Sequence, residues 1–166
     1  MKRIAIDRRD FRRALGQFAT GVTVVTATTK DGRPVGMTVN SFASVSLDPP
    51  LVLWSLSRQA SSFADFLDAS HFAINVLAAN QHHLSRHFST SVADKFARVE
   101  YTQSAGGPLL KEAIAHFICR TFRQYEGGDH VILVGEVEEY QWHQGKPLVF
   151  HSGRYHLATR HPDLPE

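Results

Sequence analysis

The stretch GMTVNSF, residues 36–42, followed by SVSLDPPLVL, residues 44–53, decides the fold that this sequence predicts. Hydroxyl and amide side chains interrupt two short runs of β-forming residues, and the double proline at 49–50 then leads into a fully apolar run. Proline marks a corner or a sheet edge because it lacks an N–H, and aliphatic runs of this length are typical of buried strands. We therefore expect short strands that meet at the prolines and carry a polar rim at their ends.

Similar β-forming runs recur along the whole chain. The Asp31-Gly32 pair lies between two of them, which predicts a tight hairpin. Few helices are predicted, at 7–20, 61–69 and 81–88, with an irregular loop at 89–110. Because no strand–helix–strand alternation appears, the pattern predicts a mainly β fold, a closed antiparallel Greek-key-type barrel with a few short helices. The strands that we expect cover residues 22–28, 35–39, 42–46, 51–56, 72–77, 117–125, 130–140 and 147–151.

The first predicted helix has two different sides. Apolar side chains recur at helical spacing opposite a set of arginines, and Gly21 is the expected helix stop. The apolar side holds Phe11, Ala14, Leu15 and Phe18, whereas the basic residues are Lys2, Arg3, Arg8, Arg9, Arg12 and Arg13. Asp7 and Asp10 interrupt the basic set, which is the pattern of a solvated helix face. With a formal net charge of only +2, nucleic acid is not an expected partner.

Composition sets further bounds. A chain of 166 residues suffices for one domain with one sizeable core. Its single cysteine, Cys119, lies in a strand-like run and reads as a buried structural thiol, with no intrachain disulfide. No apolar run approaches the roughly 20 residues of a membrane span, and no apolar leader opens the chain, so we expect a cytoplasmic protein without a membrane partner.

Several kinds of chemistry lack their sequence signatures. The chain has no GxGxxG for a Rossmann dinucleotide site, no GxxxxGK[ST] for a phosphate loop and no GxSxG for a serine hydrolase. His82, His83 and His87 share a short helix but have no carboxylate or cysteine partner nearby in sequence, so no metal site is expected.

Small polar residues instead recur at strand ends and at one helix start. Each residue alone is typical of a turn or a cap, but a flat heterocycle with a phosphate tail would need both kinds of partner. The candidates are Thr38, Asn40, Ser41, Ser55, Ser57, Arg58, Ser61, Ser62 and Asn75.

These segments, taken in order, resemble the short-chain flavin reductase family. The matching pieces are FATGVTVVT (18–26), GMTVNSF (36–42), SLDPPLV (46–52), FAINVL (72–77), DKF (94–96), GDH (128–130), GEV (135–137), PLVF (147–150) and GRY (153–155). The resemblance covers a core of about residues 10–157 within a single domain, 1–166, and leaves 158–166 as a tail. It implies an FMN-binding split barrel and an NAD(P)H:flavin oxidoreductase that reduces FMN or FAD with NADH or NADPH.

The resemblance also implies a role for each matched position. Thr38, Asn40 and Ser41 would contact the isoalloxazine and ribityl groups, and Ser55, Ser57, Ser61 and Ser62 would lie towards the phosphate, with Arg58 adding charge. The Asn75 strand would complete the wall, Lys95 and Phe96 would close a loop over the flavin, and Arg154 and Tyr155 would border the pocket. Gly128, Asp129 and His130 form the family's nicotinamide signature, with His130 as the catalytic residue. The family commonly has Thr where this chain has Ser62, and either hydroxyl can serve.

Partners follow from the same resemblance: a homodimer, and a flavin-dependent monooxygenase that receives reduced flavin by diffusion. Two alternatives stay open at this point. One is a pyridoxamine-phosphate-oxidase-like flavoenzyme on the same barrel. In such enzymes the phosphate-binding site is built largely from Arg and Lys, whereas Ser and Thr dominate here. The other is a flavin-binding sensor that accepts no hydride.

Overall fold

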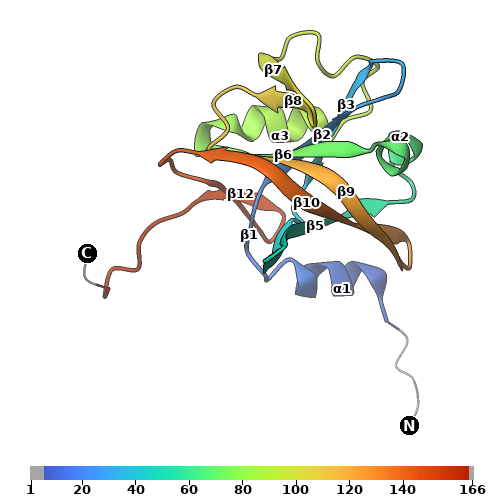
Figure 1. The fold of residues 1–166 in the computed structure, drawn as a ribbon. Helices are drawn as coiled ribbons and strands as arrows, with labels where there is room; N and C mark the ends of the chain where they lie inside the picture. The colour runs from blue at the N-terminus through green and yellow to red at the C-terminus, as the bar shows by residue number, and fades with distance from the viewer. Residues whose placement is uncertain (1–5, 165–166) are drawn as a thin grey trace.

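The β-branched residues after Gly21 form the first hairpin of the main sheet in the computed structural model, which describes residues 6–164 (Figure 1). Strand β2 (Thr23–Thr28) pairs antiparallel with β3 (Pro34–Val39). Gly32 takes a φ of +84° in the connecting turn, a conformation that glycine adopts without strain. The predicted hairpin is therefore confirmed. The basic residues Lys2 and Arg3 lie outside the described residues, as do 165–166 of the tail.

Seven strands make the main antiparallel sheet, in the order β3-β2-β6-β9-β10-β5-β4. Its other members are β4 (Ala43–Leu47), β5 (Pro50–Ser57), β6 (His71–Val76), β9 (Ala115–Gly127) and β10 (His130–Trp142). A three-stranded sheet joins β1 (Thr20–Gly21), β11 (Leu148–His151) and β12 (Arg154–Leu157), and a separate hairpin joins β7 (Tyr101–Ser104) to β8 (Gly107–Leu110). The helices are α1 (Arg8–Leu15), α2 (Phe63–Asp68) and α3 (His82–Phe88), the last preceded by a short 3₁₀ turn at Ala79–Gln81.

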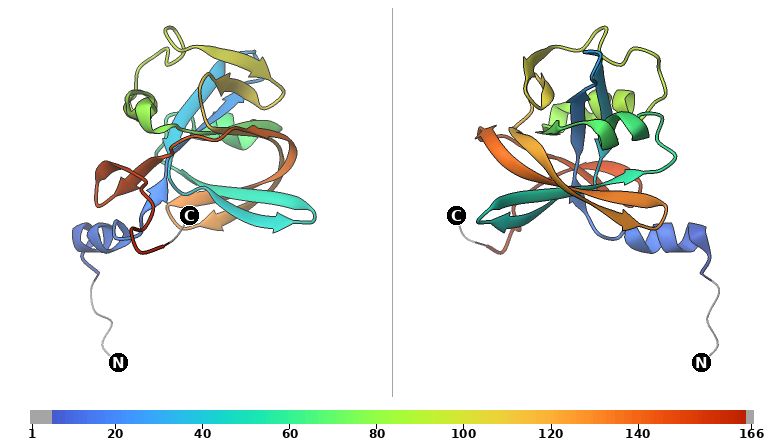
Figure 2. Two further views of the ribbon diagram at one scale, coloured as in Figure 1. Left: turned by 90° about the vertical axis from the view of Figure 1, so that its left-hand side faces the viewer. Right: turned by 45° about the vertical axis from the view of Figure 1, so that its right-hand side comes forward.

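The mainly β antiparallel architecture is confirmed, but the closed barrel is wrong for the part of the chain that the structure describes. Strands β3 and β4 end the sheet and do not pair with each other. The sheet nevertheless curls strongly (Figure 2), because Val35 of β3 and Trp54 of β5 bury their side chains in the same apolar cluster. The curl brings the two ends of the sheet to one core without hydrogen bonds between them.

Strand β2 lies between two cores, which explains why it is apolar on both faces. Val25 and Ala27 point into the cluster enclosed by the curled sheet. Val22 and Val24 point the other way, into a second cluster with Phe88 of α3 and Leu148 of β11. Successive strand residues face opposite sides, so both faces of β2 are buried, including the threonines at 23 and 26.

Three segments differ from the sequence prediction. Helix α1 ends at Leu15, with Gly16 as its C-cap, and Gly21 belongs to β1. The predicted loop at 89–110 contains the β7–β8 hairpin, and β12 follows the strand that was expected to be last. The difference at Thr20 and Gly21 has a tertiary cause: both residues pair with β11, and this pairing outweighs their place in the helical pattern.

Helix α1 lies outside both cores, beneath the main sheet in Figure 1. Asp7 caps its start by accepting a hydrogen bond from the Asp10 N–H at 2.8 Å. At its other end the Gly16 carbonyl accepts a hydrogen bond from the Ser152 N–H at 2.9 Å. None of its residues is buried, so its apolar side is left uncovered. Within residues 6–164, no helix has the length and apolarity needed to cross a membrane.

Candidate functional site

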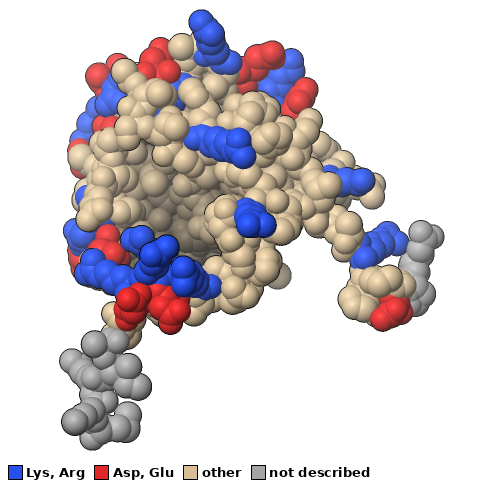
Figure 3. Space-filling model, turned by 180° about the vertical axis from the view of Figure 1, so that it is seen from behind, with Lys and Arg blue, Asp and Glu red and all other residues tan. Residues whose placement is uncertain are grey.

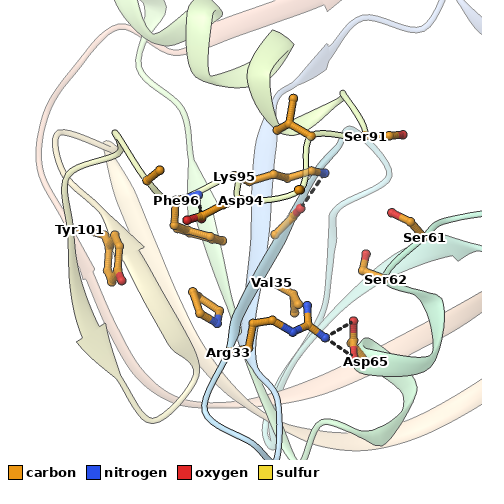
Figure 4. Close-up of a pocket in the computed structure, with 15 residues that line it drawn as sticks. Arg33, Val35, Ser61, Ser62, Asp65, Ser91, Asp94, Lys95, Phe96 and Tyr101 are labelled. Atoms are coloured by element: carbon orange, nitrogen blue, oxygen red, sulfur yellow. Dashed lines mark hydrogen bonds and ion pairs between the residues drawn. The ribbon is translucent and has the colours of Figure 1, made fainter.

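A pocket of about 770 Å³ lies between the start of β3, the start of α2 and the loop at 91–97 (Figure 4). Ser61, Ser62, Lys95 and Phe96, four of the sequence candidates, line it together. Ser62 is the N-cap of α2 but makes no capping bond with its side chain. The described residues offer neither serine hydroxyl a hydrogen-bond partner, so both are free for a ligand. Because α2 has only six residues, we attach more weight to the hydroxyls than to the helix dipole.

Lys95 fixes the loop that covers this pocket. Its ammonium donates hydrogen bonds to the carbonyl of Gly36 at 3.1 Å and to that of Phe88 at 3.0 Å. Burial lowers the pKa of Lys95 below its ordinary value. An ammonium has three N–H donors, so one remains for an anion in the pocket.

Phe96 anchors the same loop from inside. Its ring is 7% exposed and packs edge-on to Phe88, with ring centroids 5.1 Å apart. Gly36 makes this packing possible, because a Cβ at that position would lie 2.9 Å from the Phe88 ring and 3.0 Å from Phe96. The pocket floor and the loop over it are therefore one packed unit.

A second group of candidates meets at the β9–β10 turn. His130 opens β10 and lies opposite both Ser57 of β5 and Gly127 of β9. Its Nδ1 lies 2.7 Å from Oδ1 of Asp129, and the carboxylate must accept, so Nδ1 carries the proton and Nε2 is left free. The hydrogen bond and charge of His130 lower the pKa of Asp129. The His130 side chain is 42% exposed, which leaves its free edge open to a ligand.

Gly128 allows this turn, with a φ of +73°. Arg58 braces it: its backbone N–H donates to the Asp129 carbonyl at 3.0 Å, its Nε donates to the Gly128 carbonyl at 3.2 Å, and its guanidinium pairs with Glu126. These bonds occupy Arg58 within the protein, so its role here is to position the turn. Its Nη1 donors form no hydrogen bond among the described residues, so the expectation that Arg58 adds charge near a phosphate stays a prediction.

Ser41 lies in the connection between β3 and β4, and its side chain bonds to β5. Its hydroxyl accepts a hydrogen bond from the Ser55 N–H at 2.9 Å, on the side of β5 where the pairing with β4 ends at Leu53. Asn40, the residue before it, is exposed and has no side-chain partner among the described residues. Ser41 is therefore structural at this edge, and Asn40 is free.

Thr38 and Tyr155 meet at α3 through one residue. The Thr38 hydroxyl donates to the Ser85 carbonyl at 2.6 Å, and the Tyr155 hydroxyl lies 2.8 Å from the Ser85 hydroxyl. Ser85 was not among the sequence candidates, because a serine inside a predicted helix carries no signal of its own. Arg154, next to Tyr155, is exposed on β12.

Asn75 does not lie with the other candidates. Its side chain is 0% exposed; its amide donates to the Val24 carbonyl at 3.0 Å and to the Thr26 hydroxyl at 3.2 Å, and its oxygen accepts from the Leu110 N–H at 2.8 Å. With donors and acceptor occupied, it is a core residue, and the expectation that it walls a ligand site is not supported.

The pocket also contains residues that the sequence reading missed. Arg33 and Asp65 form an ion pair at 3.2 Å on its lining, and Ser91 and Tyr101 complete it. Among these four residues, only Arg33 had a signal in the sequence, namely its position directly after the predicted hairpin turn. In residues 6–164 no group of three or more His, Cys, Asp or Glu side chains is placed to hold a metal ion.

The flavin reductase like domain matches residues 15–159, which include the pocket and the β9–β10 turn. The chain belongs to this family. A flavin reductase, "FMN reductase (NADH) SmoA" of Agrobacterium fabrum, is 49% identical over 92% of this chain and 87% of its own length. The reductase component of a flavin-dependent trigonelline monooxygenase from Acinetobacter baylyi is 45% identical, and this chain spans 49% of it.

A solved flavin reductase has the same fold. The NADH:FAD oxidoreductase SgcE6 of Streptomyces globisporus, in complex with NAD and FAD fragments, superposes with a TM-score of 0.87 at 39% identity. The match covers 98% of this chain and 99% of that one. The family resemblance read from the ordered sequence motifs is thus confirmed.

Proposed function

We propose that this protein is an NAD(P)H-dependent flavin reductase that reduces FMN or FAD and supplies the reduced flavin to a partner monooxygenase. The family match across residues 15–159 is the observation that carries this proposal. NADH is the donor that we favour, because relatives are named as NADH-dependent reductases. The reaction balances as NADH, a proton and oxidised flavin giving NAD⁺ and reduced flavin.

The pocket fits the phosphate end of a flavin. The free hydroxyls of Ser61 and Ser62 and the remaining N–H of Lys95 are donors, as a phosphate requires. Few cationic side chains take part, which argues against a pyridoxamine-phosphate-oxidase-like grip. When bound, the flavin supplies the acceptor for a hydride, and the protein supplies position and electrostatics.

His130 is the residue that we propose for the nicotinamide. Asp129 holds its ring by the 2.7 Å bond at Nδ1, which leaves Nε2 to contact the carboxamide of the donor. The hydrogen-bonded turn fixes the ring in place, and hydride transfer needs donor and acceptor held in the correct orientation. A sensor that accepts no hydride would not need this arrangement.

Oxidation of NADH and NADPH by purified protein, with FMN, FAD or riboflavin added in turn, tests the proposal. We expect rapid loss of nicotinamide absorbance with at least one flavin. His130→Ala should lower this rate, whereas His161→Ala, in the exposed tail, should not. Folded protein that speeds none of these reactions would refute the reductase function. Bound flavin that stays oxidised under NADH would favour the sensor.

We also propose a homodimer that covers the apolar side of α1. Phe11 and Leu15, one turn apart on α1, are 50% and 58% exposed, and Phe18, in the turn after the helix, is 80% exposed. Contiguous exposed apolar surface of this kind marks an interaction site. Light scattering should give the mass of two chains, and Phe11→Ser/Phe18→Ser should shift it towards one. Trp142→Ser, which removes another exposed aromatic, should leave the dimer intact. A wild-type protein of one chain would contradict the proposal.

Three further expectations remain proposals. The match over 15–159 supports one domain with a core at about 10–157. Transfer of reduced flavin by diffusion is supported by relatives named as reductase components or subunits of monooxygenases, in which the reductase is a separate part. A cytoplasmic location stays a prediction of the sequence.

A further inference from the structure

The arginine side of α1 is exposed, and at its Gly16 end it is turned towards the β11–β12 turn. A Cβ on Gly16 would lie 3.6 Å from Ser152, so the helix side that contains Gly16 points towards the β11–β12 turn. Arg9 and Arg12 occupy the same side, seven and four residues earlier, and Arg8 lies at its edge. At the far end of this side, Arg8 is near enough to Asp129 to help lower the pKa of its carboxyl, after the larger effects of His130. The arginine side of α1 therefore extends from the His130 turn to the β11–β12 turn.

Figure 3 shows the surface beside the arginine side of α1. A deep hollow lined by uncharged residues opens on this face, and α1, which follows the grey N-terminal residues, lies along its lower edge. The basic side chains at α1, which are all arginines, gather on the side of the hollow, and the acidic side chains lie below them. Within residues 6–164, none of the four arginines Arg8, Arg9, Arg12 and Arg13 forms an ion pair with a carboxylate.

Uncompensated arginines beside an uncharged hollow suit a ligand that is flat and apolar at one end and anionic at the other. Two reactants have this chemistry, the nicotinamide dinucleotide and the flavin phosphate. The pocket at Ser61, Ser62 and Lys95 already offers donors to a flavin phosphate, and no residue of α1 or of the β9–β10 turn lines it. Figure 1 places α1 at the opposite end of the molecule from the β3 turn, where that pocket begins.

We infer that Arg8 and Arg12 of α1 bind the diphosphate of the nicotinamide dinucleotide, while its nicotinamide reaches His130. The inference rests on the proposed function and adds a binding role for a helix outside both cores. From Arg8 to Gly16 the helix is about 12 Å long at a rise of about 1.5 Å per residue, long enough for two guanidinium groups to flank a diphosphate. Removal of these charges should weaken binding of the dinucleotide and leave hydride transfer unchanged, so both are positioning residues for the donor.

The test compares Arg8→Gln/Arg12→Gln with the wild type for two donors and two flavins. NADH carries the diphosphate, whereas 1-benzyl-1,4-dihydronicotinamide has the same reacting ring without phosphate. FMN and riboflavin differ in the same way. Lys30→Gln/Lys146→Gln removes the same charge from exposed sites away from α1 and serves as the control. Turnover by the wild type with either donor establishes the reductase function separately.

We expect the KM for NADH to rise about tenfold in the α1 variant, the loss expected for two exposed charge-assisted contacts. The kcat, the KM for the phosphate-free donor and the KM for each flavin should stay within about twofold, since only phosphate contacts are lost. An unchanged KM for NADH, or an equal loss with the phosphate-free donor, would overturn the inference. A loss seen with FMN and absent with riboflavin would also overturn it, by assigning the arginines to the flavin.

A measurement on the wild type covers the case in which the double variant does not fold. Raising the salt concentration screens exposed charges, so the KM for NADH should rise with ionic strength while that for the phosphate-free donor stays constant. Equal salt dependence of both donors would count against the role of the arginines. The charge-preserving variant Arg8→Lys/Arg12→Lys should recover most of the affinity for NADH.

Discussion

Replacement of Asn75 by alanine should unfold this protein more easily and leave its flavin site intact. The side chain makes three hydrogen bonds at 3.0, 3.2 and 2.8 Å in a fully buried position. The alanine variant would leave the Leu110 N–H without its side-chain acceptor, and a buried unsatisfied group costs about 1–3 kcal/mol. Adding about 1 kcal/mol for the weakened partners on β2 gives a loss near 3 kcal/mol.

Urea unfolding, followed by circular dichroism, measures this loss. With a denaturant slope of about 2 kcal/mol per molar, the midpoint should fall by about 1.5 M. Asn80→Ala, at an exposed position, should not move the midpoint. The flavin affinity of the folded fraction should be unchanged below the transition. A variant with wild-type stability and lost flavin binding would refute our reasoning and restore Asn75 to the site.

Three other perturbations test the packing and the buried ionisable groups. Gly135→Ala should cost about 1–3 kcal/mol of the free energy of unfolding by overpacking, because its Cβ would lie 2.4 Å from Phe72, whereas Gly21→Ala, with nothing within 4 Å, should be nearly neutral. Burial raises the pKa of the Cys119 thiol to about 12, so a thiol reagent should label it only in urea, and the stability that it contributes should fall as pH rises from about 9 towards 12. Burial lowers the pKa of His116 below its ordinary 6.5, so unfolding by acid should become easier as pH falls below that value, and His116→Gln should reduce this dependence in urea titrations at several pH values.

Much of the sheet could be predicted because its cause is local. Alternation, β-branching and the Asp31-Gly32 turn fix the β2–β3 hairpin wherever it is placed. The curl of the sheet could not be predicted, because it depends on Val35 and Trp54 packing in one cluster from strands that do not pair. Strand β1 was missed for a similar reason: Thr20 and Gly21 become a strand only through their pairing with Phe150 and Val149.

The candidate site also has a part that the sequence predicts and a part that depends on long-range packing. Motif order alone gave the family, and it indicated Ser61, Ser62, Lys95 and Phe96, which the fold brings together in one pocket. The sequence could not show which polar side chains already form hydrogen bonds within the protein. Asn75 satisfies its hydrogen bonds inside the core, a difference that appears only when partners distant in sequence are placed.

The packing of the loop at 91–97 has a consequence for the timing of binding. Lys95 ties the loop to two carbonyls, and Phe96 is buried against Phe88, so the wall of the pocket exists before any ligand arrives. Association then requires little ordering of the chain, and its rate should approach that of diffusion into an open site. Because little ordering entropy is lost on binding, the contacts that the pocket offers contribute more fully to affinity. Release of a ligand then depends on breaking its contacts with the pocket and not on opening the loop.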